Sequence, residues 1–165
     1  MRLLFILLCI SNVIIAQDSE KKKIKKNLLY IEIGGAGGYG SVNYEYLAMK
    51  LNKLKFSAKV GLSTYRLYDY TNEFNPEIIV PIGLHFYYGD KHNIDLGLGQ
   101  TITSVVYADN KTYQPKRQAR LNTNLFIGYR YQGGKGLLFK IGYAPIIEIQ
   151  RVFRNWASLT LGYNY

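Results

Sequence analysis

Apolar and polar side chains alternate along most of the chain, in eight separate runs. A period of two places successive side chains on opposite faces of a β-strand, so each run predicts one strand. Most runs reach or exceed the ~9–11 residues that a tilted membrane-spanning strand needs. The predicted strands are Leu28–Gly35, Gly40–Leu47, Leu54–Tyr65, Ile78–Tyr88, Asn93–Tyr107, Leu121–Tyr131, Leu137–Ile147 and Trp156–Tyr165.

The connections between these runs alternate in length. Tight turns are predicted at Asn52-Lys53, Gly89–His92 and Gln132–Lys135. The links between them are longer, at Arg66–Glu77, Ala108–Arg120 and Glu148–Asn155, and only the first link, Ala36–Tyr39, is unexpectedly short. An even number of strands with alternating short turns and long loops predicts an all-β fold. The specific prediction is an eight-stranded antiparallel up-and-down transmembrane β-barrel, with its short turns and both chain ends on the periplasmic side.

The two faces of the predicted strands differ in character. One row holds large apolar side chains such as Leu96, Ile127 and Leu161, whereas the other holds Gly, Ser, Thr, Asn and scattered charges. A soluble barrel or sandwich would show the same alternation with its apolar face inward. The glycines favour a polar interior, because the lumen of an eight-stranded barrel is only just wide enough for side chains. The glycines on the polar row are Gly34, Gly61, Gly83, Gly97, Gly99, Gly128, Gly142 and Gly162.

Aromatic residues gather near both ends of the predicted strands, as expected at two membrane interfaces. Those near the short turns are Tyr46, Phe86, Tyr87, Tyr88, Tyr129, Tyr131, Tyr163 and Tyr165, and those near the long loops are Tyr39, Tyr65, Tyr68, Tyr107 and Trp156. Two residues do not fit. Gln100 lies on the apolar row and Pro81 lies inside the fourth run, and a β-bulge near either would reconcile it with the barrel.

The first 27 residues do not follow the strand pattern. Met1-Arg2 precedes the apolar run Leu3–Ile10, and the stretch ends in Ala16. This predicts a secretory signal peptide over residues 1–16, cleaved near Ala16, because the run is shorter than the ~20 residues of a transmembrane helix. Residues 17–27 are predicted to form a basic, solvated periplasmic linker, followed by a barrel domain over residues 28–165.

Composition agrees with one all-β domain. The 165 residues include 16 tyrosines and 16 glycines, and the aromatic and aliphatic content is too high for a disordered chain. The single cysteine excludes a disulfide scaffold. The formal net charge of +10 would suit a nucleic-acid partner, but the predicted export of the chain argues against one.

The closing segment Ser158-Leu159-Thr160-Leu161-Gly162-Tyr163-Asn164-Tyr165 alternates apolar residues and ends in an aromatic residue. With this segment, the signal peptide and eight strands, the chain resembles the small outer-membrane barrels of Gram-negative bacteria, of the OmpA/OmpX type. The resemblance covers residues 28–165 as architecture. It implies a monomer in the outer membrane, in contact with membrane lipid and lipopolysaccharide. It also implies recognition of the segment ending at Tyr165 by the barrel-assembly machinery.

Titratable residues on the predicted lumen row are expected to pair, because isolated charges in a narrow interior are costly. The turn at Asn52 places Glu45 opposite Lys59. The fifth and sixth strands are neighbours and bring Asp95 near Arg130, and the turn after the fourth strand leaves His85 close to Asp95. We therefore predict a salt-bridged interior without a continuous pore, and the alternative is a set of small water pockets. The residues of this interior network are Glu32, Glu45, Lys59, His85, Asp95, Arg130 and Lys140.

Catalytic and metal-binding motifs are weak in this sequence. Some eight-stranded outer-membrane barrels modify lipid A, but His85 is followed by Phe86-Tyr87-Tyr88 rather than by the Ser-Asn pair of the deacylases. The glycine-rich Gly34–Gly40 stretch lacks the Lys-Ser/Thr pair of a phosphate-binding loop and is interpreted as the first hairpin. No His/Cys/Asp cluster has the spacing of metal ligands. We expect neither enzyme activity nor a cofactor.

Basic residues in the long loops are candidates for contact with lipopolysaccharide phosphates. The predicted function is a structural or interaction role in the outer membrane: envelope integrity, lipopolysaccharide contact, or binding of a surface partner through the loops. The alternatives are a lipid A-modifying enzyme, a small channel and a soluble periplasmic lipid-binding barrel. The candidate contact residues are Lys111, Lys116, Arg117, Arg120, Arg151 and Arg154.

Overall fold

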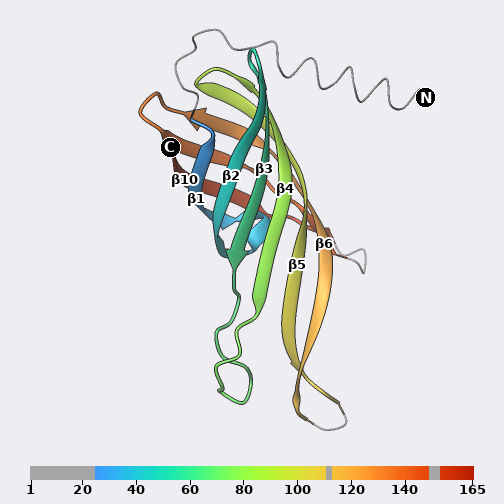
Figure 1. Cartoon of the computed structure of the whole chain (residues 1–165). Helices are drawn as coiled ribbons and strands as arrows, with labels where there is room; N and C mark the ends of the chain where they lie inside the picture. The colour runs from blue at the N-terminus through green and yellow to red at the C-terminus, as the bar shows by residue number, and fades with distance from the viewer. Residues whose placement is uncertain (1–24, 111–112, 149–152) are drawn as a thin grey trace, which may run out of the picture.

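The computed structural model of the chain describes residues 25–110, 113–148 and 153–165. The predicted signal peptide and most of the predicted linker lie outside these residues, as do Lys111 and Arg151. Within the described residues, long antiparallel strands wrap into a barrel, and the described chain starts and ends near the short turns (Figure 1). No helix in this part of the chain is long and apolar enough to cross a membrane.

Eight strands form the barrel wall in the spatial order β5-β4-β3-β2-β1-β10-β7-β6, and pairing of β5 with β6 closes it. Every pairing is antiparallel, which confirms the predicted all-β barrel. Two short strands between β7 and β10, β8 (Ile146–Ile147) and β9 (Phe153–Arg154), pair with each other, and β8 also pairs with β6. The wall strands are β1 (Asn27–Gly34), β2 (Gly40–Leu51), β3 (Leu54–Ser63), β4 (Ile78–Gly89), β5 (His92–Ala108), β6 (Pro115–Gln132), β7 (Leu137–Tyr143) and β10 (Ala157–Asn164).

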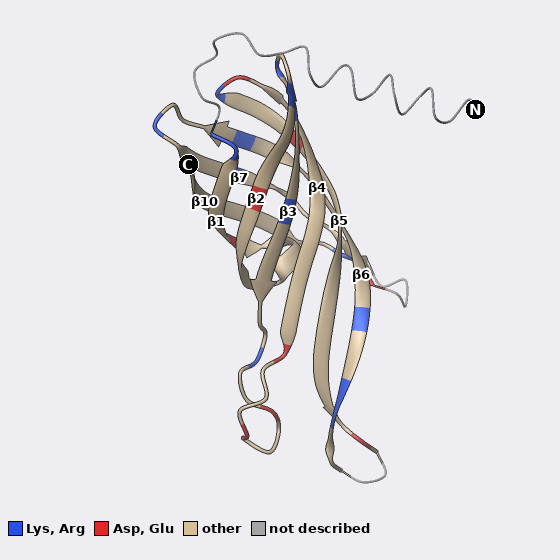
Figure 2. Ribbon diagram, viewed as in Figure 1, with Lys and Arg blue, Asp and Glu red and all other residues tan. Residues whose placement is uncertain are grey.

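The strands turn their apolar row outward and their polar row inward. Leu96, Ile127 and Leu161 are 49%, 55% and 58% exposed, whereas Lys59 and Arg130 are only 8% and 1% exposed. Figure 2 shows the same distribution, with few charged positions along the barrel wall and more on the turns, the loops and the far end of β6. A soluble barrel with an apolar core would have the opposite arrangement, so the polar row is the lumen.

The hairpin of β5 and β6 is longer than predicted and extends beyond the rest of the wall (Figure 1). β5 has 17 residues and β6 has 18, and Val105–Ala108 pair with Pro115–Gln118. At ~3.3 Å per residue, such strands span roughly 55 Å. The predicted link Ala108–Arg120 is therefore too long, because Ala108 belongs to β5 and residues 115–120 belong to β6. Both faces of residues 115–120 are solvent-exposed, so the paired backbone continues without the apolar alternation that marks a buried strand.

Two further differences concern proline. β7 ends at Tyr143, before Ala144-Pro145, so the predicted run Leu137–Ile147 is split into β7 and β8. Pro81 does not lie at a bulge, because Val60↔Ile82 and Ser63↔Ile79 keep one register on either side of it. Gly61 lies across from Pro81, and a Cβ atom on Gly61 would come within 3.0 Å of the proline ring. The missing side chain of Gly61 thus makes room for Pro81.

Gln100 also keeps its register, between Ile82 on β4 and Thr123 on β6. Its amide Nε2 donates a hydrogen bond to the Thr123 hydroxyl at 3.1 Å, which satisfies a polar group on the outer face. Among the ladders of the described strands, the one register shift lies between Leu47 and Met49 on β2. Neither Pro81 nor Gln100 therefore lies at a β-bulge, and the barrel accommodates both residues in regular register.

Glycines on the lumen row make room for large interior side chains. Gly128 on β6 pairs with Gly142 on β7, and the Phe126 ring lies over both. A Cβ atom added at Gly128 or Gly142 would lie 2.8 or 2.7 Å from Cζ of Phe126, which is closer than van der Waals contact permits. The glycines thus let an aromatic ring fill a lumen that is too narrow for side chains from every position.

Replacing Gly142 with alanine is expected to lower the free energy of unfolding by about 1–3 kcal/mol, because the added methyl group overpacks the lumen. It would also lie 2.6 Å from the Ile127 carbonyl oxygen, which cannot move without disturbing the sheet. Denaturant unfolding of the protein in detergent micelles measures the effect. Gly134→Ala in the β6–β7 turn is the matched control, since nothing lies within 4 Å of its added Cβ. Equal stability of the two variants would contradict the proposed steric role.

Candidate functional site: the polar interior of the barrel

The lumen is closed by apolar and polar contacts at the end with the short turns. Leu28, Tyr30 and Leu138 form a buried apolar cluster there. Close by, the ammonium group of Lys55 donates to the Gly89 and Asp90 carbonyl oxygens at 2.9 and 3.1 Å. The same group also donates to Asn93 Oδ1 at 2.9 Å. These contacts pack side chains across this end of the lumen.

A connected ionic network occupies the middle of the lumen. The Nη1 atom of Arg130 lies 2.7 Å from Glu45 Oε1 and 3.3 Å from Asp95 Oδ2. Asp95 also accepts from Lys140 Nζ at 3.1 Å, and its Oδ1 lies 2.7 Å from His85 Nδ1. All five side chains are buried. Asp95 is therefore the centre of the network, because it contacts three of the other four.

A second ion pair lies beside this network and includes hydroxyl donors. Lys59 Nζ is 3.4 Å from Glu32 Oε2, and the Ser158 hydroxyl donates to Glu32 Oε1 at 2.6 Å. The Ser57 hydroxyl donates to Glu45 at 2.6 Å. Charge-assisted hydrogen bonds of this kind are stronger than neutral ones, and they reduce the cost of placing carboxylates away from water.

Aromatic rings surround the cationic members of the network. The Arg130 guanidinium carbon lies 3.8 Å from the centre of the Tyr87 ring. The Lys140 ammonium group lies 4.7 Å from the centre of the Phe126 ring and 5.5 Å from that of Tyr30. The electron-rich faces of these rings attract the cations, and the effect is larger at desolvated sites than at the surface.

The structure places all seven sequence-derived lumen residues inside the barrel, but it rearranges one partnership. Glu45 pairs in register with Lys59, as the turn at Asn52 predicts. The ion pairs, however, join Glu45 to Arg130 and Lys59 to Glu32. Long side chains from several strands meet in a narrow lumen. A charged group can therefore contact a partner on the opposite wall as well as its in-register neighbour on the adjacent strand.

Sequence reasoning missed two functional side chains of the lumen. Tyr87 lies near a short turn as predicted, but it does not belong to a membrane-facing aromatic band, because it is 2% exposed and covers Arg130 inside the barrel. Lys55 was not counted among the interior charges. The alternation of strand residues predicts both positions, because side chains two residues apart face the same side of a strand. Lys55 precedes the inward-facing Ser57 by two residues, and Tyr87 follows the inward-facing His85 by two.

The glycine-rich link between β1 and β2 forms a short 3-10 turn, η1 (Gly35–Gly37), that folds into the lumen. Gly35 and Gly38 have φ angles of 71° and 77°, which side-chain-bearing residues rarely adopt. The Thr101 hydroxyl donates to the Ala36 carbonyl at 2.9 Å, and the Ser63 hydroxyl donates to the Gly37 carbonyl at 2.8 Å. The stretch thus connects the first two strands as interpreted, and it also covers the ionic network on the loop side.

The interior contains a serine, a histidine and an aspartate, yet its geometry is that of a closed network. Ser57 pairs in register with His85, and His85 contacts Asp95. All three are at most 2% exposed, and the Ser57 hydroxyl is directed to Glu45. A nucleophile needs access to its substrate, and this one is enclosed by the barrel wall. In the part of the chain that the structure covers, no group of three His, Cys, Asp or Glu residues is arranged to hold a metal ion.

The basic loop residues are largely engaged with their own neighbours. Lys116 Nζ lies 2.6 Å from Asp109 Oδ2, and Arg154 forms an ion pair with Glu148. Arg117 donates to the Pro76 carbonyl at 3.1 Å and also contacts Asn75. Arg120 donates to Gln118 at 3.3 Å. Arg117 therefore joins the β5–β6 hairpin to the loop after β3.

Comparison with solved structures gives a clear result for the fold. The N-terminal β-barrel domain of Pseudomonas aeruginosa OprF has a TM-score of 0.56 and 12% identity, over 85% of this chain and 98% of that one. The Yersinia pestis outer membrane protein Ail has a TM-score of 0.53 and 9% identity, over 86% of this chain and 100% of that one. This chain has the eight-stranded barrel fold of OprF and Ail.

A third structure, Neisserial surface protein A, has a TM-score of 0.43 and 13% identity, over 83% of this chain and 90% of that one. No protein-family profile and no curated protein sequence matches the chain. The similarity to the OprF barrel domain and Ail confirms the resemblance to small outer-membrane barrels as a resemblance of fold.

Proposed function

We propose that this protein is an integral outer-membrane β-barrel with a structural and surface-interaction role and no catalytic step. The observation that supports the proposal best is the inverted distribution of its side chains, with an aliphatic outer wall and ion pairs inside. In water, such a wall would leave an unusually large apolar surface exposed. In a membrane, the same apolar wall contacts acyl chains, and the closed sheet leaves no strand edge with unpaired backbone groups.

The proposal includes the orientation and assembly of the barrel. The short turns and both ends of the mature chain face the periplasm, after cleavage near Ala16, and the long loops face outward. The protein is a monomer, and the barrel-assembly machinery recognises the segment that ends at Tyr165. Alternation of short turns with long loops supports this orientation, because the short turns of outer-membrane barrels are periplasmic.

The contents of the lumen favour the structural role over a lipid carrier or a channel. A lipid carrier needs an apolar cavity, whereas this interior holds buried ion pairs. A channel needs a continuous aqueous path, whereas Arg130, Lys140 and η1 lie across this one. Recordings in planar bilayers discriminate the channel alternative, since steady single-channel openings would contradict a closed interior.

The outward end of the barrel provides the interaction surface. The β5–β6 hairpin projects from the wall, and Arg117 ties it to the loop after β3. The Tyr70 hydroxyl adds a second tie, donating to the Tyr113 carbonyl at 2.7 Å. This braced hairpin carries Lys116 and Arg120, which stay exposed beside their contacts with Asp109 and Gln118 and can therefore meet lipopolysaccharide phosphates or a surface partner.

Fractionation of cells that express the full chain tests the membrane assignment. The protein is expected to stay in the outer-membrane pellet after alkaline carbonate extraction and to need detergent for release. Its folded form should migrate differently from the boiled form on a denaturing gel, because a closed barrel resists unfolding by detergent alone. Release with the soluble periplasmic fraction, without detergent, would contradict the proposal.

A further inference from the structure

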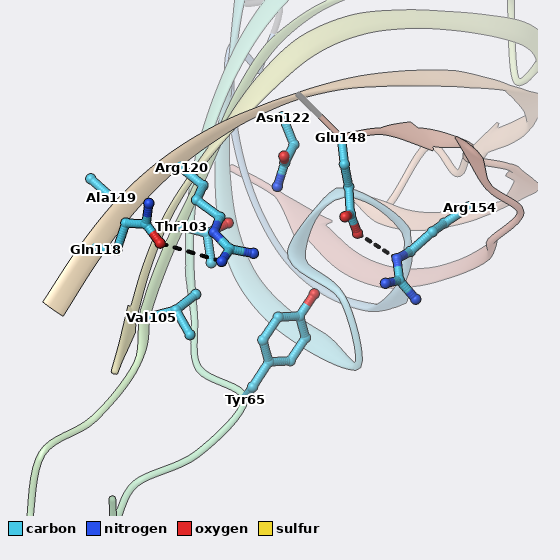
Figure 3. A pocket seen from close by; sticks show the side chains of 9 residues that line it. All are labelled: Tyr65, Thr103, Val105, Gln118, Ala119, Arg120, Asn122, Glu148 and Arg154. Carbon is cyan, nitrogen blue, oxygen red and sulfur yellow. Dashed lines mark hydrogen bonds and ion pairs between the residues drawn. The ribbon is translucent and has the colours of Figure 1, made fainter. Parts of the chain in front are cut away.

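A cavity of about 500 Å³ opens at the loop end of the lumen, above η1. Ala36 and Thr101 lie at its base, Thr103 and Asn122 come from β5 and β6, and Glu77 ends the loop after β3. Figure 3 shows an adjoining part of about 300 Å³, in which Tyr65, Thr103 and Asn122 lie around one hollow. Both volumes are typical of small-molecule sites in proteins, which measure ~300–1,000 Å³.

Three aromatic rings form one side of this cavity. Tyr39 packs edge-to-face against Tyr65, with ring centres 5.5 Å apart, and against Trp156, with centres 5.8 Å apart. Edge-to-face packing is a favoured geometry for aromatic pairs and holds the rings against one another. Tyr39 and Tyr65 remain 72% and 39% exposed, so ring surface is available to a ligand. Partial burial raises the pKa of the Tyr65 phenol, so its hydroxyl remains a hydrogen-bond donor at neutral pH.

Polar side chains also line the cavity, among apolar ones. Glu77 is 6% exposed, yet its carboxylate has no hydrogen bond or ion pair to any described residue. The backbone at Glu77 is held in place, because its N–H donates to the Arg66 carbonyl at 2.9 Å. The Thr103 hydroxyl and the Asn122 amide also lack side-chain hydrogen bonds within the described residues. None of these three side chains is among those whose polar atoms are fully enclosed without a partner, so their polar atoms are reachable from the cavity and are available to a ligand rich in donors and acceptors.

We propose that this cavity binds a sugar ring of a glycan. The C–H face of a pyranose stacks on the aromatic side, and its hydroxyl groups donate to the Glu77 carboxylate and accept from the Asn122 amide. Arg66 and Arg154 line the cavity together with Glu77 and Glu148, and Arg154 is paired with Glu148. The formal charges of the lining therefore balance, which suits a polyhydroxylated ligand better than a strongly charged one. This inference rests on the proposed function, in which the loop end faces the cell exterior. There the glycan belongs either to neighbouring lipopolysaccharide or to a soluble molecule.

Trp156 is the single tryptophan of the chain, so its fluorescence reports on this cavity alone. The full chain, folded in detergent micelles, is titrated with the methyl glycosides of glucose, galactose, N-acetylglucosamine and glucuronic acid. At least one is expected to shift the emission saturably, and Glu77→Gln should weaken that binding at least tenfold. Glu73→Gln, an exposed carboxylate of the same loop, is the matched control and should bind as the wild type does.

The source of the glycan is tested in nanodiscs made with and without lipopolysaccharide. If Trp156 emission differs between the two kinds of nanodisc and the soluble glycoside reverses the difference, the glycan belongs to lipopolysaccharide. If emission is the same in both and the glycoside still binds saturably, the glycan belongs to a soluble molecule. Two results would overturn the inference: no response to any glycoside in either setting, or equal affinity of the Glu77→Gln and Glu73→Gln variants. Heat-modifiable migration of the same samples shows separately whether the barrel is folded, so failure of the sugar site is distinguishable from failure of the proposed function.

Discussion

Replacing Arg130 with methionine is expected to lower the free energy of unfolding by about 3–5 kcal/mol, which is typical of removing one partner from a buried ion pair. Methionine keeps much of the apolar stem but leaves the carboxylates of Glu45 and Asp95 without the guanidinium that lies within 2.7 and 3.3 Å of them. It also removes the cation from the face of Tyr87. Denaturant unfolding in detergent micelles, followed by tyrosine and tryptophan fluorescence, measures the loss.

Arg120→Met on the same strand is the matched control, because Arg120 is exposed and makes one hydrogen bond at 3.3 Å. Its effect should stay within about 0.5 kcal/mol. Adding Glu45→Gln to Arg130→Met should recover part of the loss, since the double variant no longer buries one of the unpaired charges. If the two arginine variants unfold alike, the lumen is hydrated enough to support free carboxylates and the network is not what holds the strands together.

Strand periodicity predicts the fold and the contents of the lumen well, for a physical reason. Side-chain direction in a strand depends only on parity, so one correct assignment fixes which residues face inward along the whole strand. This is why Glu32, Asp95 and Lys140 all lie inside as predicted. Antiparallel turns also fix the neighbours, and Glu45 indeed lies opposite Lys59.

The choice of ion-pair partner is not available from the same reasoning. It depends on how far the strands tilt and shear around the barrel, which no short stretch of sequence encodes. Glu45 therefore reaches Arg130, four strands away along the chain, instead of the lysine beside it. The inward fold of η1 is not predictable from sequence for a related reason. Glycines permit a tight turn, but they do not determine whether the turn points into the lumen or away from it.

The start of β6 at Pro115 could not be predicted from the sequence either. Alternation arises only where one face of a strand is buried or meets lipid, and residues 115–120 do neither. Their cross-strand backbone hydrogen bonds to β5 continue regardless, so the hairpin keeps its structure beyond the wall. For loops of such barrels, a polar stretch between two strands is therefore as compatible with an extended hairpin as with an irregular loop.

Replacing Ile127 with lysine is expected to lower the free energy of unfolding in phospholipid vesicles by about 2–4 kcal/mol, as for a cation near the middle of a bilayer. Ile127 is 55% exposed on the outer wall and pairs with Leu96 and Tyr143. Its side chain lies on the outer face, so the substitution tests whether the barrel wall is surrounded by lipid or by water. Unfolding and refolding titrations in vesicles measure it.

Leu121→Lys on the same strand controls for depth, because Leu121 lies six residues closer to the outer end and is 46% exposed. A cation near the membrane interface costs only about 0–1 kcal/mol, so the two lysine variants should differ by roughly 2 kcal/mol. In water, both substitutions would place a charged group on a solvent-exposed surface at little cost. If Ile127→Lys is as stable as Leu121→Lys, the aliphatic wall does not face acyl chains, and the membrane assignment fails even though the ionic lumen remains.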